Sequence, residues 1–229
     1  MSGNPVVIVA AHNEADRIGA TLAALAGAFP GAQVVVADDA SSDGTAELAL
    51  SRGAEVVGRR KPRGKGANVT AAVETVLHRA DEGDPPTFLL CDADLGASAR
   101  ELRGLVEAVE GGDCDLAVAA FRDRVGGGFG IGLRFARWAI ERRCGYRAGA
   151  PISGQRAMPA QVLRTVVPFA PGYGMETGMT IDAVRAGYRL REIELDLEHR
   201  ATGRSLGGFW HRARQLGDFG RAYASRRRR

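Results

Sequence analysis

The most informative segment of the sequence is Thr87-Phe-Leu-Leu-Cys91-Asp92-Ala93-Asp94-Leu95. A short apolar run of this kind predicts a buried strand. The run ends in two carboxylates, Asp92 and Asp94, so a tight turn can direct both at a hard divalent cation such as Mg²⁺ or Mn²⁺. Such a cation can in turn hold a diphosphate. Aspartates after strands are also common turn residues, and the spacing alone leaves both interpretations open.

The residues before this segment repeat a strand, loop and helix pattern three times. Apolar runs of strand length occur at 5–10, 33–37 and 55–57, and each precedes a polar loop and a helical periodicity. Consecutive units of this kind predict a parallel sheet with right-handed crossovers, in which the Asp92 strand is the fourth. The predicted fold class is therefore α/β, with a Rossmann-like, mostly parallel central sheet flanked by helices.

The second half of the sequence predicts further elements. Ser98 and Glu101 have the spacing of a capping box, which predicts a helix that begins at Ser98. A fifth strand is expected at 115–120 and an edge strand at 188–197. Between these strands lies a helical pattern whose aromatic residues, Phe135 and Trp138, are expected in the core.

Polar side chains follow the first, second and fourth predicted strands. Because the carboxyl ends of parallel strands meet at one edge of a sheet, we expect these loops to share one rim. A rim this acidic needs a cation or a hydrogen-bonding ligand. Lys65 adds a compact positive charge suited to a phosphate, although its loop can also be read as a solvated basic surface. The rim residues are His12, Asn13, Glu14, Asp38, Asp39, Asp92 and Asp94.

Composition narrows the class of protein. The chain has 229 residues, of which 45% are hydrophobic and 25% charged, which is typical of a globular protein with one substantial core. No apolar run approaches the roughly 20 residues needed to cross a bilayer, so we expect a cytoplasmic protein. Cys91, Cys114 and Cys144 match no metal spacing, and we expect them to be reduced interior residues.

The net charge of +4 is concentrated at the C-terminal end. Residues 199–229 contain nine arginines against Asp218, a balance of +8, which leaves residues 1–198 at −4. In 207–229 aromatic residues lie among the arginines, as in helices that rest on an anionic membrane surface; a solvated tail is the alternative. The acidic body and the lack of a recognised module argue against nucleic-acid binding.

Four segments, taken together, resemble family 2 glycosyltransferases of the GT-A fold. They are Val6–Ile18, VVVADDASSDGT at 34–45, RGKGANVTAA at 63–72 and LLCDADL at 89–95. The resemblance implies transfer of a hexosyl group from a UDP- or GDP-sugar with Mn²⁺ or Mg²⁺. It further implies that the nucleotide sugar is bound by Ala11, His12, Asn13, Glu14, Asp39, Lys65, Asp92 and Ala93.

Particular roles follow from this resemblance. Asp94 is expected to ligate the metal, while Asp92 contacts the sugar, the ribose or the metal. The carboxylate of Asp39 can accept a hydrogen bond from the imide N–H of uracil or the N1–H of guanine. Two departures are visible: Ala10-Ala11-His12 replaces the usual proline and aromatic residue, and no glutamine follows Asp94-Leu95.

Two later segments resemble the acceptor halves of particular members. Ser153, Gly154 and Arg156 match the Ser-Gly-x-Arg segment of dolichol-phosphate mannose synthase-like enzymes, which implies acceptor binding. Residues 168–182 resemble glucosyl-3-phosphoglycerate synthases and include Glu176, expected to orient the acceptor or the sugar, or else to be a helix N-terminal glutamate. Thr177 follows where many inverting members have a catalytic aspartate. This favours a phosphate acceptor, which is already anionic at neutral pH, or a retaining mechanism.

The last candidates lie near the tail. His199 is the expected third metal ligand, and Arg200 with Arg204 can bind an acceptor phosphate. We expect a GT-A domain at 1–206, divided into a nucleotide-sugar half (1–120) and an acceptor half (121–206), and a basic amphipathic tail at 207–229. Polyprenyl phosphate is the favoured acceptor, at an anionic membrane surface. The alternatives are a small phosphorylated acid and a non-catalytic nucleotide-binding module, and a homodimer is left open.

Overall fold

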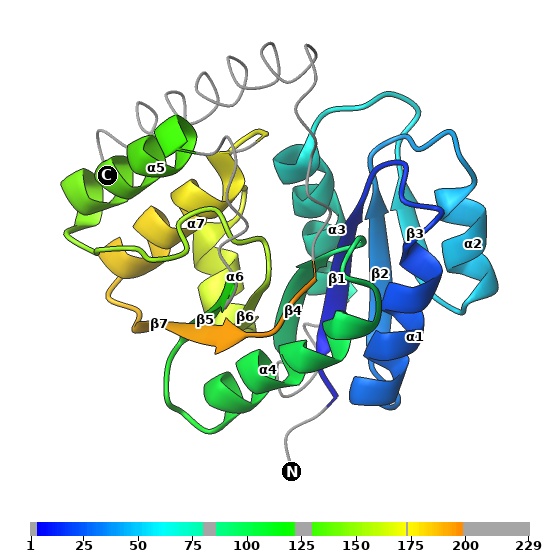
Figure 1. The fold of residues 1–229 in the computed structure, drawn as a ribbon, viewed down its shortest axis with the longest axis horizontal. Helices are drawn as coiled ribbons and strands as arrows, with labels where there is room; N and C mark the ends of the chain where they lie inside the picture. Colours follow the sequence, from blue (N-terminus) through cyan, green and yellow to red (C-terminus); the bar gives the residue numbers. More distant parts are fainter. Residues whose placement is uncertain (1–3, 80–85, 122–129, 173, 199–229) are drawn as a thin grey trace.

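The computed structural model describes residues 4–79, 86–121, 130–172 and 174–198 (Figure 1). The strands in these residues are β1 (Val6–Ala11), β2 (Gln33–Asp38), β3 (Glu55–Gly58), β4 (Thr87–Asp92), β5 (Leu116–Phe121), β6 (Arg156–Pro159) and β7 (Leu190–Leu195). The helices are α1 (Ile18–Ala28), α2 (Thr45–Ser51), α3 (Lys65–Arg79), α4 (Arg103–Glu110), α5 (Gly130–Cys144), α6 (Ala160–Val166) and α7 (Gly174–Arg185), with a 3-10 helix, η1 (Gly96–Leu102), before α4.

The strands form one sheet in the order β3-β2-β1-β4-β6-β5-β7. The first four strands along the chain pair in parallel, which confirms the predicted βα units. β7 lies at the edge of the sheet, as its alternating sequence predicts. It runs parallel to β5. β6 was not predicted, and it runs antiparallel between β4 and β5. Strands from both halves of the chain therefore belong to a single sheet.

Helices cover both faces of this sheet because its strands are apolar on both sides. Val7 and Val9 of β1 pack with α1, η1 and α4. Val6 and Ile8, which alternate with them, pack with α3, α6 and α7 on the other face. Continuous apolar runs are what a parallel sheet buried on both faces requires.

The capping-box prediction is wrong. α4 begins at Arg103, after the 3-10 turn η1, and no side chain caps it. The Ser98 hydroxyl donates to the carbonyl of Leu95 (2.7 Å) and accepts from the backbone N–H of Glu198 (2.9 Å). The Ser98 side chain, which the local pattern predicted as a helix cap, thus takes part in a long-range contact with Glu198.

The aromatic prediction for α5 is also wrong in part. Ile140 of this helix is buried, but Trp138 is 49% exposed and Phe135 is half-buried beside it, with ring centroids 5.5 Å apart.

Cys91 and Cys114 are buried and Cys144 is partly buried, all three as free thiols. Within the part of the chain that the structure describes, no helix combines the length and the hydropathy needed to span a bilayer.

A close approach of backbones at Gly66 yields a testable prediction. A Cβ atom on Gly66 of α3 would lie 2.0 Å from the carbonyl oxygen of Ala170. Gly66→Ala should therefore lower the free energy of unfolding by roughly 1–3 kcal/mol, because the backbone at Ala170 or in α3 must move to make room for the methyl group. Gly27 of α1 has nothing within 4 Å of its Cβ position, so Gly27→Ala should stabilise by roughly 0.5–1 kcal/mol. Thermal unfolding of both variants measures this, and equal responses would contradict it.

Candidate active site

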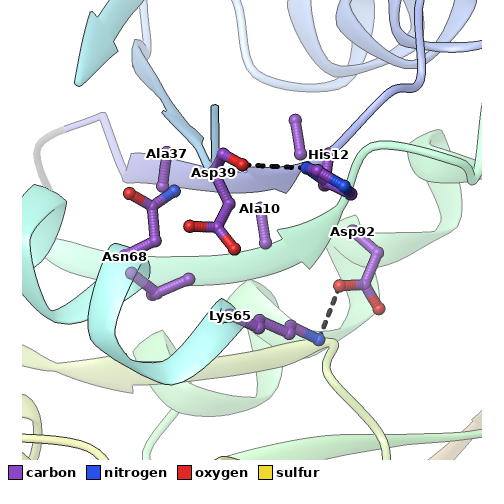
Figure 2. A pocket seen from close by; sticks show the side chains of 9 residues that line it. Ala10, His12, Ala37, Asp39, Lys65, Asn68 and Asp92 are labelled. Atoms are coloured by element: carbon purple, nitrogen blue, oxygen red, sulfur yellow. Dashed lines mark hydrogen bonds and ion pairs between the residues drawn. The ribbon is translucent and has the colours of Figure 1, made fainter. Parts of the chain in front are cut away.

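The carboxyl ends of β1, β2 and β4 meet at one edge of the sheet. Ala11 pairs with Asp38, and Ala10 pairs with Asp92. A pocket of about 120 Å³ opens at this edge (Figure 2). The loops that the sequence predicted to share a rim therefore contribute to one pocket. Its lining residues are Ala10, Ala11, His12, Ala37, Asp39, Lys65, Asn68, Val69 and Asp92.

The first loop is tied to the second by hydrogen bonds. Nδ1 of His12 donates to the carbonyl of Asp39 (2.8 Å), which leaves Nε2 as an acceptor toward the Asn13 amide (3.4 Å). Asn13 has a φ of 55°, and its Oδ1 accepts from the backbone N–H of Ser42 (2.9 Å). The backbone N–H of Glu14 donates to Thr45 Oγ1 (2.9 Å). These bonds fix the position of the loop that forms one wall of the pocket.

The carboxylate of Asp39 is engaged by the basic loop. One oxygen accepts the backbone N–H of Arg63 and the other accepts that of Gly64, each at 2.8 Å. The neighbouring Asp38 accepts bonds from the backbone and hydroxyl of Ser41 and so holds its own turn. Asp39 thus lines the pocket and at the same time fixes the loop that leads to Lys65.

Lys65 lies between two carboxylates from distant parts of the chain. Its Nζ is 2.6 Å from Oδ1 of Asp92 and 2.9 Å from Oε1 of Glu176, at the start of α7. Burial acts to lower the pKa of the Lys65 ammonium, but the two negative charges outweigh it and raise that pKa above its ordinary value. Lys65 is therefore a permanent cation that joins β4 to α7.

The loop before β6 completes this cluster. The side chain of Gln155 donates to Oδ2 of Asp92 (2.9 Å), and its own oxygen accepts from the Ser153 hydroxyl (3.1 Å). A Cβ atom on Gly154 would lie 2.5 Å from Nζ of Lys65 and 2.7 Å from Asp92 Oδ2. A side chain at position 154 would therefore have to displace the ammonium or the carboxylate of the ion pair.

Arg156 is fully buried and is not among the residues that line the pocket. Its Nε donates to the carbonyl of Ser153 and its Nη1 to Thr180 Oγ1, both at 2.9 Å. Burial lowers the pKa of Arg156 to about 10, against the nearby charges of Glu176 and Glu192. The guanidinium thus anchors the 153–156 loop to α7, and the predicted contact of this side chain with an acceptor stays a prediction.

The predicted metal ligands are only partly within the described residues. Asp92 and Asp94 leave the end of β4 on the same loop, and both are half-buried. No three His, Cys, Asp or Glu side chains gather as a metal site in the described ranges. The predicted third ligand, His199, and the predicted acceptor ligands Arg200 and Arg204 lie outside those ranges, as does the tail at 207–229.

Comparisons with known proteins agree with this geometry. The family described as glycosyl transferase family 2 matches residues 6–164. The chain belongs to this family.

Named relatives and solved structures give further detail. An undecaprenyl-phosphate mannosyltransferase of Micrococcus luteus is 29% identical to this family 2 glycosyltransferase over 221 residues, which cover 87% of this chain and 86% of that protein. The structure of glucosyl-3-phosphoglycerate synthase from Mycobacterium tuberculosis with phosphoglyceric acid has a TM-score of 0.77 at 25% identity, over 98% of this chain and 80% of that one. Its complex with Mn²⁺, UDP and glucosyl-3-phosphoglycerate has a TM-score of 0.74 at 25% identity, with the same coverage. The expected GT-A fold and the likeness to both kinds of enzyme are confirmed.

Sequence reasoning overlooked two residues of the glycosyltransferase site. Gln155 holds Asp92, although it occupies the variable position of the Ser-Gly-x-Arg segment. Asn68 lines the pocket and is 1% exposed, although its helical spacing resembles that of the core residues around it. A polar residue at a buried position of α3 was the one signal that the sequence offered for Asn68.

Removal of the Lys65 cation should destabilise the protein. In the native protein the stability contributed by the raised pKa of Lys65 is fully present below the ordinary lysine pKa, so none of it changes between pH 5 and 8. In Lys65→Met the carboxylates of Asp92 and Glu176 both lose the ammonium that they share, and Glu176 is almost completely buried.

We therefore expect Lys65→Met to lose roughly 3 kcal/mol of unfolding free energy, because a buried carboxylate is left without its ammonium partner. Urea unfolding near neutral pH measures the loss. Lys61→Met, at an exposed position of the loop before α3, is the control and should behave like the native protein. Equal stability of Lys65→Met and the native protein would show that the carboxylates do not depend on this ammonium.

Proposed function

We propose that this glycosyltransferase moves a hexosyl group from a UDP- or GDP-sugar to a polyprenyl phosphate with the help of Mn²⁺ or Mg²⁺. The observation that carries the proposal is the charge cluster of Lys65, Asp92 and Glu176 beside a pocket that Asp39 also lines. The pocket receives the nucleoside, and the lysine lies next to it as a partner for a diphosphate. UDP is favoured because it is bound in the similar synthase structure.

The donor set fits a hard divalent cation. Asp94, which follows Asp92 on the same loop, is the residue proposed to ligate the metal directly, because carboxylate oxygens are the ligands that such a cation prefers. Asp92 and His199 are proposed as the further ligands. When bound, the metal supplies Lewis-acid chemistry by neutralising the charge of the leaving diphosphate. Mn²⁺ is favoured over Mg²⁺ by the imidazole in this set and by its presence in the similar structure.

The environment of Glu176 supports a phosphate acceptor. This carboxylate is 5% exposed and is held by Lys65, so it is poorly placed to take a proton from an acceptor alcohol. Thr177, which replaces the expected aspartate, is fully buried. A phosphate monoester needs no such base because its second pKa is about 6. Glu176 is therefore proposed to position Lys65, and Arg200 with Arg204 is proposed to bind the acceptor phosphate.

The outer face of α5 favours a lipid over a small acid as the carrier of this phosphate. Trp138 is exposed there beside Phe135, on a helix with four arginines and a single acidic residue, Glu141. Apolar rings among cations suit the boundary of an anionic membrane. The polyprenyl-phosphate relative agrees with this choice. Transfer to a small phosphorylated acid is the second candidate, and the glucosyl-3-phosphoglycerate synthase structures favour it.

Turnover tests the enzyme class and the metal ligand together. Asp94→Ala should lower Mn²⁺-dependent release of UDP or GDP from nucleotide sugars by roughly 100-fold or more, because the cation loses its direct carboxylate. Asp113→Ala, in the turn before β5, is the control and should keep full activity.

Parallel assays with a polyprenyl phosphate in detergent and with 3-phosphoglycerate identify the acceptor. A native protein that binds nucleotide without turning over any donor would support the non-catalytic alternative.

Membrane association can be tested at Trp138. Trp138→Ser should reduce co-sedimentation of the full chain with vesicles that contain anionic lipid, because the ring no longer inserts at the interface. Leu50 of α2 is the matched control, since it is also a large exposed hydrophobic residue, at 58%. Leu50→Ser should leave the bound fraction unchanged. Equal losses in both variants, or in neither, would count against α5 as the membrane-facing surface.

A further inference from the structure

Asn68 is a buried polar side chain whose oxygen receives no hydrogen bond from the described part of the chain. It lies on α3, close to Lys65, and is 1% exposed. Its side-chain oxygen, Oδ1, has no hydrogen-bond partner among the described residues. Figure 2 shows the amide beside Ala37 and the carboxylate of Asp39, and the residue lines the same pocket. An amide with an unpartnered oxygen thus borders the space proposed for the nucleoside.

Such a residue is costly for folding alone. A buried polar group without a partner costs roughly 1–3 kcal/mol, whereas an apolar side chain of the same shape avoids that cost. Leucine has nearly the shape of asparagine, and the surrounding residues Val69, Ala72 and Val73 are apolar and buried. Packing therefore does not explain the amide, which points to a ligand that completes its hydrogen bonds.

The rest of the pocket narrows the chemistry of that ligand. Ala10, Ala37 and Val69 present small apolar surfaces that suit a flat ring. Asp39 adds an acceptor at the same wall, since each of its oxygens keeps a lone pair after accepting from the backbone of Arg63 and Gly64. Oδ1 of Asn68 can accept from an N–H of the ring while its Nδ2 donates to the adjacent carbonyl, and the Asp39 carboxylate is an alternative acceptor for that N–H.

We propose that Asn68 is a specificity-determining residue that pairs with the base of the donor nucleotide, a step that rests on the proposed function. The edge it recognises has an N–H next to a carbonyl, which uracil and guanine possess and cytosine lacks. Asn68 thereby adds a base contact beside Asp39, whose carboxylate is also expected to accept from the base.

The experiment uses Asn68→Leu in the full chain and calorimetric titration with UDP, GDP, CDP and inorganic pyrophosphate, each with Mn²⁺. The variant should bind UDP roughly tenfold more weakly and pyrophosphate with unchanged affinity, because only the base contact is lost. The native preference for UDP over CDP should shrink accordingly. A tenfold loss for GDP in place of UDP would assign guanine as the base and would equally support the contact. Asn68→Ala provides a second variant with the same expected pattern.

Two controls separate binding from folding. Thr75→Ala, on the same helix, removes a hydroxyl that donates to the Ala71 carbonyl and should leave all affinities unchanged. Asn68→Leu should melt at or above the native temperature, since it removes an unpartnered buried group. A lower melting temperature, equal losses for UDP and pyrophosphate, or no loss for any nucleotide would overturn the inference.

The same data distinguish this inference from the proposed function. If the native protein turns over a UDP- or GDP-sugar while Asn68→Leu binds that nucleotide normally, only the role of Asn68 is refuted. If the native protein binds no nucleoside diphosphate and turns over no donor, the proposed function fails and the inference fails with it.

Discussion

The position of one ammonium group organises the site. Nζ of Lys65 contacts Asp92 at the end of β4 and Glu176 at the start of α7, and these two carboxylates lie far apart in the sequence. Without the cation, two negative charges would face each other where Glu176 is almost completely buried. The ion pairs therefore hold the proposed nucleotide-binding edge of the sheet against the helix of the proposed acceptor half. A side chain at position 154 would have to displace these same charged groups.

This arrangement gives each charged group a partner before any ligand arrives. Asp92 shares the Lys65 ammonium with Glu176 and receives a further bond from Gln155, while Asp39 accepts two backbone N–H groups. A diphosphate and its cation would exchange partners with groups that are already fixed in place. Catalytic electrostatics depends on such preorganisation, because fixed dipoles and charges need not reorient when the leaving group develops its charge.

The parts of the fold that follow from local pattern were predictable. Apolar runs separated by helical periodicity give the four parallel strands and their shared edge, because βα units admit one handedness of crossover. β6 was not predictable in this way, since its four residues carry little pattern and their place between β4 and β5 depends on pairing across a long sequence separation. Ser98 illustrates the same limit: its hydroxyl bonds to the backbone of Glu198, a residue that no local rule connects with it.

At the site, sequence reasoning identified the charged residues and Asn13 but missed the amides of Gln155 and Asn68. Charges such as Lys65 and Asp92 stand out in a motif because burying them requires a partner or a ligand. Amides are neutral and common, and whether Gln155 or Asn68 serves the fold or a ligand depends on where a tertiary neighbour lies. Gln155 donates to Asp92 within the protein and therefore supports the site. The oxygen of Asn68 has no partner among the described residues. This difference, which is visible only in the coordinates, distinguishes a residue that supports the site from one that can bind a ligand.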